Sequence, residues 1–178
     1  RPNAKLDGIV VMGAAAVGKS SIISQFLYER FVSEYKETIE ELHRGEYSVK
    51  GTQLVLDILD TAGAHSFPAM RKLAIATSNA FILVYSVNDD TSFDEVIAMR
   101  EQIIAERDDE NVPIVIVANK TDVLEEKRII TMDRANSKHP VLRGFSGAFG
   151  LEGQIKRAQI CLISNRIIII SKILSYNV

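Results

Sequence analysis

Residues 9–20 read Ile-Val-Val-Met-Gly-Ala-Ala-Ala-Val-Gly-Lys-Ser, and this stretch decides the fold. Its apolar start, residues 9–11, is typical of a strand buried on both faces. The segment that follows, residues 20–30, has apolar side chains at helical spacing: Ile22, Ile23, Phe26 and Leu27. The stretch therefore predicts a strand, a glycine-containing loop and a helix in succession.

The loop between strand and helix, residues 13–20, matches the pattern GxxxxGK[ST] in the context that the pattern requires. Gly18 permits a tight turn in which successive N–H groups face an anion, and the start of the helix aims its positive dipole end at the same place. Lys19 adds a mobile charge for the β- and γ-phosphates, and the Ser20 hydroxyl suits magnesium. A chance match is the alternative. We predict a nucleotide phosphate site formed by Gly13, Ala15, Ala16, Val17, Gly18, Lys19, Ser20 and Ser21.

The rest of the first 120 residues continues the alternation of strand and helix patterns. Asp90, Thr91 or Ser92 is the expected N-cap of the second helix. Alternating strands and helices predict an α/β domain with a mostly parallel sheet. The predicted strands are residues 42–49 and 53–59, joined by a tight turn, then 80–87 and 112–118; the second helix is 91–107.

A second motif, Asp57-Ile-Leu-Asp-Thr-Ala-Gly63, ends the strand 53–59. A carboxylate at the carboxyl end of a buried strand beside a phosphate loop is suited to hold magnesium, which is the role we assign to Asp60. Gly63 leaves room for its backbone N–H to contact a γ-phosphate. The alternative is that Asp60 only caps the next turn.

A third motif, Asn119-Lys-Thr-Asp122, directly follows the strand 112–118. A carboxylate at Asp122 accepts two hydrogen bonds from guanine, whereas adenine would leave it desolvated and unpaired. The stem of Lys120 can lie along the base. An ordinary loop with turn-forming Asn119 and Asp122 is the alternative, and a P-loop ATPase or kinase is the competing function that Asp122 argues against.

The three motifs, in this order and spacing, resemble the Ras-type small GTPases over about residues 6–130. The resemblance implies a P-loop G-domain with six strands in a mostly parallel sheet and five flanking helices. The nucleotide, GTP or GDP with Mg²⁺, then lies at the carboxyl ends of the strands. Residues 40–43 and 66–73 are similar to the dorsal–ventral–anterior branch of Ras-like proteins.

Carried over residue by residue, the resemblance makes residues 31–41 the first switch and effector segment, with Thr38 binding magnesium and the γ-phosphate. Tyr35 would close over the phosphates, and Phe31 would lie at the edge of the guanine base. The implied metal ligands are Ser20, Thr38 and Asp60, and the implied catalytic residues are Lys19, Thr38 and Gly63. Ala148, in Ser-Gly-Ala-Phe-Gly, stands about where the family has a backbone N–H that donates a hydrogen bond to the guanine oxygen.

The chain departs from the family pattern at three places, of which one is the Ser-Gly-Ala-Phe-Gly of residues 146–150 in place of the family's Ser-Ala-Lys loop. Ala64 follows Gly63, where the family places a glutamine that orients the attacking water, so slow GTP hydrolysis is expected. Rescue by His65 is the alternative. Ala15 and Ala16 replace loop glycines near the entry of an arginine finger, so finger-assisted hydrolysis is more affected than binding. Two functions stay open: a cycling GTPase switch and a non-cycling GTP-binding module.

The chain of 178 residues divides by composition near residue 136. Residues 137–178 hold six Lys or Arg, one acid and eight isoleucines, a charge of +5, which leaves −7 on residues 1–136. We expect a G-domain body over 1–136 and an atypical C-terminal segment of the same domain over 137–178. This segment is expected either to be incompletely folded, or to form a diverged closing strand and a helix over 151–176 with Cys161 and Leu162 facing the core.

The overall composition excludes several classes of protein. A net charge of −2 gives no drive toward nucleic acid, and the single cysteine, Cys161, excludes an intramolecular disulfide framework. We expect a cytoplasmic monomer. No prenylation box is expected, because no cysteine stands four residues from the end. Contact of the basic tail with a membrane is the alternative. The expected partners are effectors at residues 35–43, an exchange factor and an activating protein.

Overall fold

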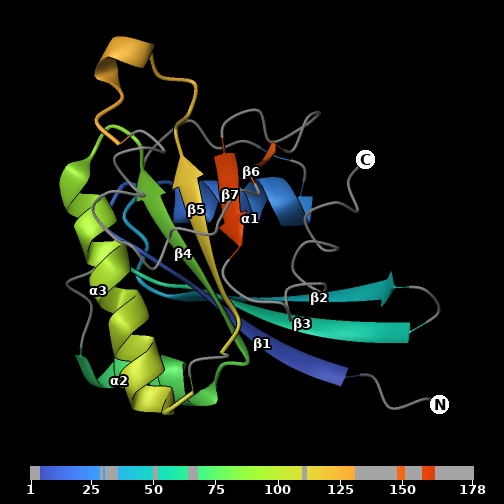
Figure 1. Ribbon diagram of the computed structural model, residues 1–178. Helices are drawn as coiled ribbons and strands as arrows, with labels where there is room; N and C mark the ends of the chain where they lie inside the picture. The colour runs from blue at the N-terminus through green and yellow to red at the C-terminus, as the bar shows by residue number, and fades with distance from the viewer. Residues whose placement is uncertain are drawn as a thin grey trace.

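The computed structural model describes residues 5–28, 30, 36–49, 52–63, 68–109, 112–130, 148–150 and 158–162. Strands and helices alternate through the first 119 residues, as Figure 1 shows. The elements in chain order are β1 (Lys5–Met12), α1 (Lys19–Tyr28), β2 (Glu41–Val49), β3 (Thr52–Asp60), α2 (Pro68–Thr77), β4 (Ala80–Ser86), α3 (Asp90–Arg107), β5 (Ile114–Asn119), the short 3-10 helix η1 (Glu125–Lys127), β6 (Ala148–Gly150) and β7 (Ala158–Leu162).

The strands form one sheet in the order β2-β3-β1-β4-β5-β7-β6. Its four central strands, β3, β1, β4 and β5, run parallel, while β2 pairs with β3 as an antiparallel hairpin. This arrangement confirms the predicted α/β class. The sheet has seven strands in the described part of the chain, where six were expected, because β7 and β6 extend it beyond β5 in antiparallel pairing.

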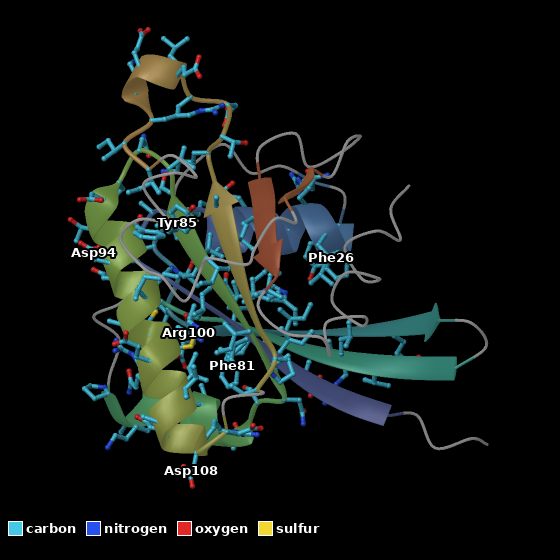
Figure 2. All side chains as sticks on the ribbon, in the orientation of Figure 1. Phe26, Phe81, Tyr85, Asp94, Arg100 and Asp108 are labelled. Carbon is cyan, nitrogen blue, oxygen red and sulfur yellow. The ribbon has the colours of Figure 1, made fainter. Side chains whose placement is uncertain are left out.

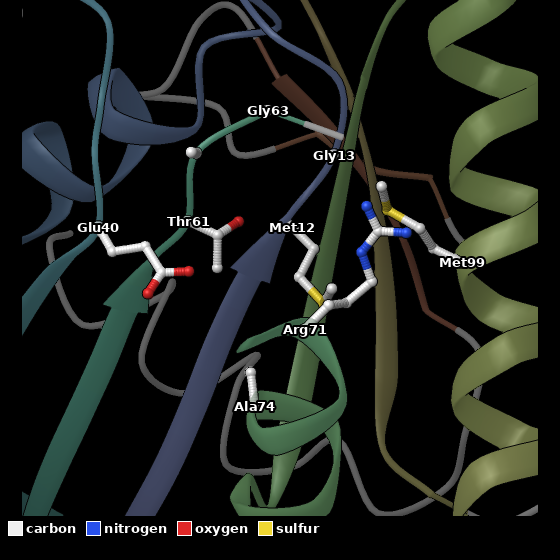
Figure 3. Close-up of a pocket in the computed structure, with 9 residues that line it drawn as sticks. Met12, Gly13, Glu40, Thr61, Gly63, Arg71, Ala74 and Met99 are labelled. Carbon is white, nitrogen blue, oxygen red and sulfur yellow. The ribbon is translucent and has the colours of Figure 1, made fainter. Parts of the chain in front are cut away.

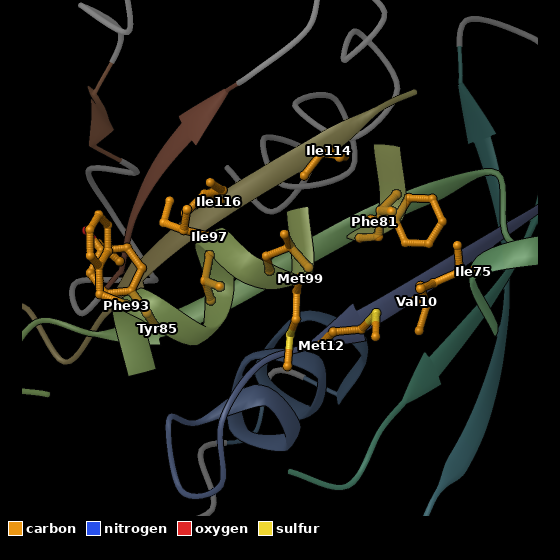
Figure 4. Close-up of a cluster of buried hydrophobic side chains, with 14 of the residues drawn as sticks. Val10, Met12, Ile75, Phe81, Tyr85, Phe93, Ile97, Met99, Ile114 and Ile116 are labelled. Atoms are coloured by element: carbon orange, nitrogen blue, oxygen red, sulfur yellow. The ribbon is translucent and has the colours of Figure 1, made fainter. Parts of the chain in front are cut away.

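Helices cover both faces of the sheet, so β4, β5 and the second half of β1 are buried on both sides. Along β1 the side chains alternate: Val10 and Met12 join a cluster with residues of α2 and α3, whereas Ile9 and Val11 join a second cluster with Ile23 of α1. Figure 4 shows the first cluster. Burial on two faces explains why these strands are uniformly apolar in sequence rather than alternating.

Helix α3 is the longest helix in the described part of the chain and lies along one side of the sheet. Its N-cap is Asp89, whose side chain accepts a hydrogen bond from the Ser92 backbone N–H, so the expected cap at Asp90, Thr91 or Ser92 was wrong by one residue or more. The difference arises because Ser92 is fully buried and its hydroxyl bonds the carbonyl of Asp89 instead. Asp94 projects from the outer face of α3, and Asp108 lies at its carboxyl end (Figure 2).

Helix α2 was not predicted from hydrophobic spacing, because only Ala74 and Ile75 are buried in it. A signal was present in Pro68, its first residue, since proline is favoured at the first helical position. At the far end of α2, Nη1 of Arg107 lies within hydrogen-bond distance of three carbonyls, those of Ile75 (3.2 Å), Ala76 (3.0 Å) and Ser78 (3.1 Å). The last residue of α3 thereby caps α2.

The described part of the C-terminal segment is extended. Cys161 and Leu162 lie in β7, opposite Ile116 and Val115 of β5, so the helix expected over 151–176 is wrong at residues 158–162. The antiparallel pairing with β5 gives the backbone N–H and C=O groups of residues 158–162 hydrogen-bond partners without a helix. Within the described residues, no helix is both long and apolar enough to cross a membrane.

Candidate nucleotide-binding site

The loop between β1 and α1 is held by two glycines with positive φ. Gly13 has φ 149°, and a Cβ built on it would lie 2.1 Å from the carbonyl oxygen of Val84 in β4. Gly18 has φ 99° and precedes the first residue of α1. The loop therefore presses against the neighbouring parallel strand and delivers its backbone to the N-terminus of α1, which is the geometry of an anion site.

Lys19, the first residue of α1, is buried with 6% of its surface exposed. Its ammonium group donates hydrogen bonds to the carbonyls of Gly13 (3.0 Å) and Ala14 (2.7 Å), so the side chain folds back over the loop. Burial lowers the pKa of Lys19, while the charges of Asp60 and then Glu95 act in the opposite sense. A buried cation in a loop of backbone donors is a strong site for polyphosphate.

The end of β3 places Asp60 beside this loop. The Thr61 hydroxyl donates to the carbonyl of Val11 at 2.8 Å, which ties the end of β3 to β1. Asp60 is 2% exposed, and burial raises its pKa, although a hydrogen bond from Ser20 and the charge of Lys19 lower it. Its buried Oδ1 has no hydrogen-bond partner among the described residues. A bound cation would stabilise a buried carboxylate oxygen of this kind.

The hydroxyls of Ser20 and Thr38 complete a set of oxygen donors around Asp60. Ser20 Oγ lies 2.7 Å from Thr38 Oγ1, which joins the helix N-terminus to the segment before β2. Within the described residues, no group of three or more His, Cys, Asp or Glu side chains forms a metal cluster. One carboxylate and two hydroxyls are hard oxygen donors, which fits Mg²⁺ bound jointly by protein and phosphates rather than by an all-protein cage.

The third motif follows β5 and is tied to the phosphate loop. Asn119 is 8% exposed, and its Nδ2 donates to the carbonyl of Val17 at 2.7 Å. A Cβ on Gly18 would lie 2.3 Å from that same nitrogen. Lys120 has a left-handed φ of 61°, and Asp122 is exposed two residues further on. The structure thus brings the first and third motifs into direct contact at the carboxyl ends of β1 and β5.

A family model described as the Ras family matches residues 8–142. The chain belongs to the Ras family. The GTP-binding protein Rhes of Homo sapiens and that of Mus musculus are each 47% identical to this chain over 122 residues, or 64% of this chain and 46% of the relative. Ras-like protein rasB of Dictyostelium discoideum is 46% identical over 123 residues, or 69% of this chain and 62% of rasB. The chain thus spans about half the length of the Rhes proteins it matches.

The first motif differs from the Ras-family pattern at Ala15, which is also where it contacts the second motif. A Cβ on Gly63 would lie 2.7 Å from the backbone nitrogen of Ala15 and 2.8 Å from its Cβ. Ala15, which stands where the family has a loop glycine, therefore lies against the glycine of the second motif. Ala64, His65, Phe31 and Tyr35, on which other predictions depend, lie outside the described residues.

Ala148, the predicted backing for the base, is not brought to the third motif. It lies in β6 opposite Cys161 of β7, and β7 separates it from β5. The residue that pairs with Asn119 is Ala158, at the start of β7. The site therefore contains the described members of the three motifs without Ala148.

A small cavity of about 10 Å³, partly open to solvent, lies beside the phosphate loop. It is bounded by the ends of β1 and β3, by α2 and by α3. Figure 3 shows Arg71 extending from α2 toward Met99 of α3. Helix α2 thus lines this cavity, through Arg71 and Ala74, together with Gly13 of the phosphate loop.

Sequence reasoning missed the backbone groups that hold the motifs in place. The carbonyls of Val11 and Val17 accept from Thr61 and Asn119, and the Val87 N–H donates to the carbonyl of Asn119 at 3.1 Å. Backbone groups carry no residue-type signal, so the three motifs did not point to them.

Proposed function

We propose that this chain is a guanine-nucleotide-dependent switch that binds GTP or GDP with Mg²⁺ and hydrolyses GTP slowly. The observation that carries the proposal is the convergence of a buried lysine, a buried carboxylate with an unpartnered oxygen, and a buried asparagine at one edge of the parallel sheet. Membership of the Ras family supports it.

Lys19 and the loop N–H groups bind the phosphates in this proposal. The ammonium donates to two loop carbonyls, so a phosphate takes over donors that are already in place. Mg²⁺ supplies charge neutralisation at the phosphates, and Ser20, Thr38 and Asp60 are the residues that would hold it. The unpartnered Oδ1 of Asp60 supports this assignment.

Asp122 selects guanine by accepting hydrogen bonds from its ring N–H and exocyclic amine. Asn119 helps to position Asp122, because its side-chain amide joins the third motif to the phosphate loop. A base and a phosphate are then bound by loops that touch each other.

Hydrolysis consists of water attack on the γ-phosphorus with cleavage of its P–O bond to the β-phosphate, which releases GDP and inorganic phosphate. Lys19 and the Gly63 N–H stabilise the charge that develops at the γ-phosphate. Ala64 has no group to orient the water, so the rate is low. The methyl of Ala15 against Gly63 narrows the space that an arginine finger needs. These two features favour the second candidate, a GTP-binding module that does not cycle.

Signalling passes through the segment that contains Thr38. Its hydroxyl touches Ser20, so the state of the phosphate site is linked to residues 35–43. Ile39 is 87% exposed and Leu42 is 60% exposed, which supports this segment as the surface for effectors. An exchange factor and an activating protein are the regulators that such a cycle requires.

The first test is the nucleotide content of the purified chain. We expect one equivalent of GTP or GDP, retained in competition with ATP, and released when EDTA removes Mg²⁺. Lys19→Ala is expected to lose it, while the exposed Lys72→Ala serves as the matched control of equal charge change. A chain that binds no guanine nucleotide, or that prefers ATP, would contradict the proposal.

Single-turnover hydrolysis separates the two candidates. A slow but measurable rate, faster than GTP in buffer and lost in Lys19→Ala, supports the cycling switch. A rate equal to that in buffer, with tight GTP binding retained, supports the non-cycling module. Asp122→Asn is expected to move preference toward xanthine nucleotides, and an unchanged GTP affinity would remove Asp122 from the site.

A further inference from the structure

The loop after β5 returns to the sheet through residues that none of the three motifs contains. From Lys120 the chain turns, with the Val123 N–H donating to the Lys120 carbonyl at 3.1 Å, and passes through η1. In Figure 1, η1 lies beyond the carboxyl end of β5. Asp122 is thus on an exposed turn whose position depends on how the loop is closed.

The returning end of this loop is anchored on Val87, the residue after β4. The carbonyl of Val87 accepts from the N–H groups of Ile129 (2.8 Å) and Ile130 (2.9 Å), and its own N–H donates to the carbonyl of Asn119 at 3.1 Å. Val87 and Ile130 are 4% and 3% exposed. One residue of the backbone therefore fixes both ends of the loop, at Asn119 and at Ile130.

Arg128 stands next to this anchor and reaches across the loop. Its Nη2 donates to the carbonyl of Thr121, the residue before Asp122. Its backbone N–H donates to the carbonyl of Glu125 at 3.1 Å, so the arginine is held at its root by η1 and by Ile129. The guanidinium is the side-chain donor that connects the closing end of the loop to the peptide unit carrying Asp122.

We propose that Arg128 is a positioning residue that sets the place of Asp122 and so determines discrimination for the exocyclic amine of guanine. The inference rests on the proposed function, because it concerns the same base site. Arg128 touches the peptide unit before Asp122 and not the base. Its loss shifts the turn while leaving the anchor at Val87 intact.

The test compares GDP with IDP, whose base lacks the exocyclic amine. In Arg128→Ala we expect GDP affinity to fall about threefold to tenfold, the effect of one charge-assisted hydrogen bond to an exposed carbonyl. IDP affinity is expected to fall less, so the ratio of the two dissociation constants moves toward one. Arg128→Lys, which keeps a cationic donor, is expected to restore part of the ratio.

Lys127→Ala is the matched control, because Lys127 is the exposed neighbour of equal charge. It is expected to leave the ratio unchanged. Equal weakening of GDP and IDP in Arg128→Ala, or a ratio equal to that of Lys127→Ala, overturns the inference. If Arg128→Ala does not fold, the ratio in Arg128→Lys decides: a wild-type value overturns the inference, and an intermediate value supports it. Absence of GDP binding in the wild-type chain contradicts the proposed function instead.

Discussion

The phosphate loop (residues 13–20) and the base loop (residues 119–130) both follow parallel strands, but they are held in different ways. The phosphate loop is fixed from inside, by a buried lysine that bonds two of its carbonyls and by a glycine pressed against β4. The base loop is fixed at its ends, by Val87 and by Arg128. A loop fixed from inside carries its geometry in its own motif, whereas a loop fixed at its ends depends on residues outside the motif.

The largest effect on stability is expected for Gly13→Ala, because it disrupts the close packing of the phosphate loop against β4. The new Cβ would lie 2.1 Å from the Val84 carbonyl at a φ of 149°, and backbone cannot move aside cheaply. We expect a loss of about 2–5 kcal/mol in the free energy of unfolding, from strain and overpacking together. Chemical denaturation measures it.

Gly8→Ala is the control for this prediction, because a Cβ there meets Asn79 Oδ1 at 3.6 Å, an ordinary contact. Equal effects of the two substitutions would contradict the internal fixing of the loop.

Gly18→Ala tests the contact between the two loops. Its Cβ would lie 2.3 Å from Asn119 Nδ2, at a φ of 99°. We expect a loss of about 2–3 kcal/mol. In the double variant with Asn119→Ala the clash is removed, so the loss should be smaller than the sum of the single losses by about 0.5–3 kcal/mol. Strict additivity in a denaturation cycle would show that the loops are independent.

A smaller effect is expected for Asn119→Ala alone. It removes the amide donor and leaves the Val17 carbonyl without that partner, at a cost of about 1–2 kcal/mol in unfolding free energy. The melting temperature should fall accordingly, and nucleotide affinity should fall with it because the phosphate loop loses a support. Asp122→Ala is the control that changes the same motif without touching Val17. A wild-type melting temperature in Asn119→Ala would show that this hydrogen bond does not stabilise the contact between the two loops.

The smallest effect is expected outside both loops, at the hairpin of β2 and β3. Arg44 donates to Asp57 at 2.6 and 2.7 Å, and these hydrogen bonds, together with the charge of Arg44, hold the pKa of Asp57 below its usual range. A depressed carboxyl pKa stabilises the fold above the unfolded value, about 3.9, and this contribution is lost as pH falls through the folded value.

Arg44→Gln should therefore lower the urea midpoint slightly at neutral pH and not at the acid end of the transition. The exposed Arg30→Gln is the control. A difference between Arg44→Gln and wild type that does not change with pH would assign the effect to packing of the arginine stem.

The strand, loop and helix around residues 13–20 were predictable from sequence, because the side chains and backbone geometry of this loop belong to one contiguous motif. Lys19, Ser20, Asp60 and Asn119 lie together as expected. Arg128 was not predicted, since it lies outside the third motif, acts through a backbone carbonyl and carries no pattern of its own.

The sheet was predictable in class but not at its edge. Central strands are defined by apolar runs, whereas β7 lies in a segment whose isoleucines suited either a strand or a helix. Partner strands decide that choice, and they are distant in sequence. Helix α2 was hidden for a related reason, since a helix with two buried residues has little hydrophobic periodicity.

The cap that Arg107 places on α2 has a mechanical consequence. One guanidinium nitrogen lies within hydrogen-bond distance of three carbonyls at and just past the carboxyl end of the helix, while Arg71 and Ala74 of the same helix line the cavity with Gly63. A translation of α2 along its axis would break all three bonds at once, but a rotation about its carboxyl end keeps them. The geometry therefore favours pivoting, in which the largest excursion occurs at the amino-terminal end of α2, which begins at Pro68.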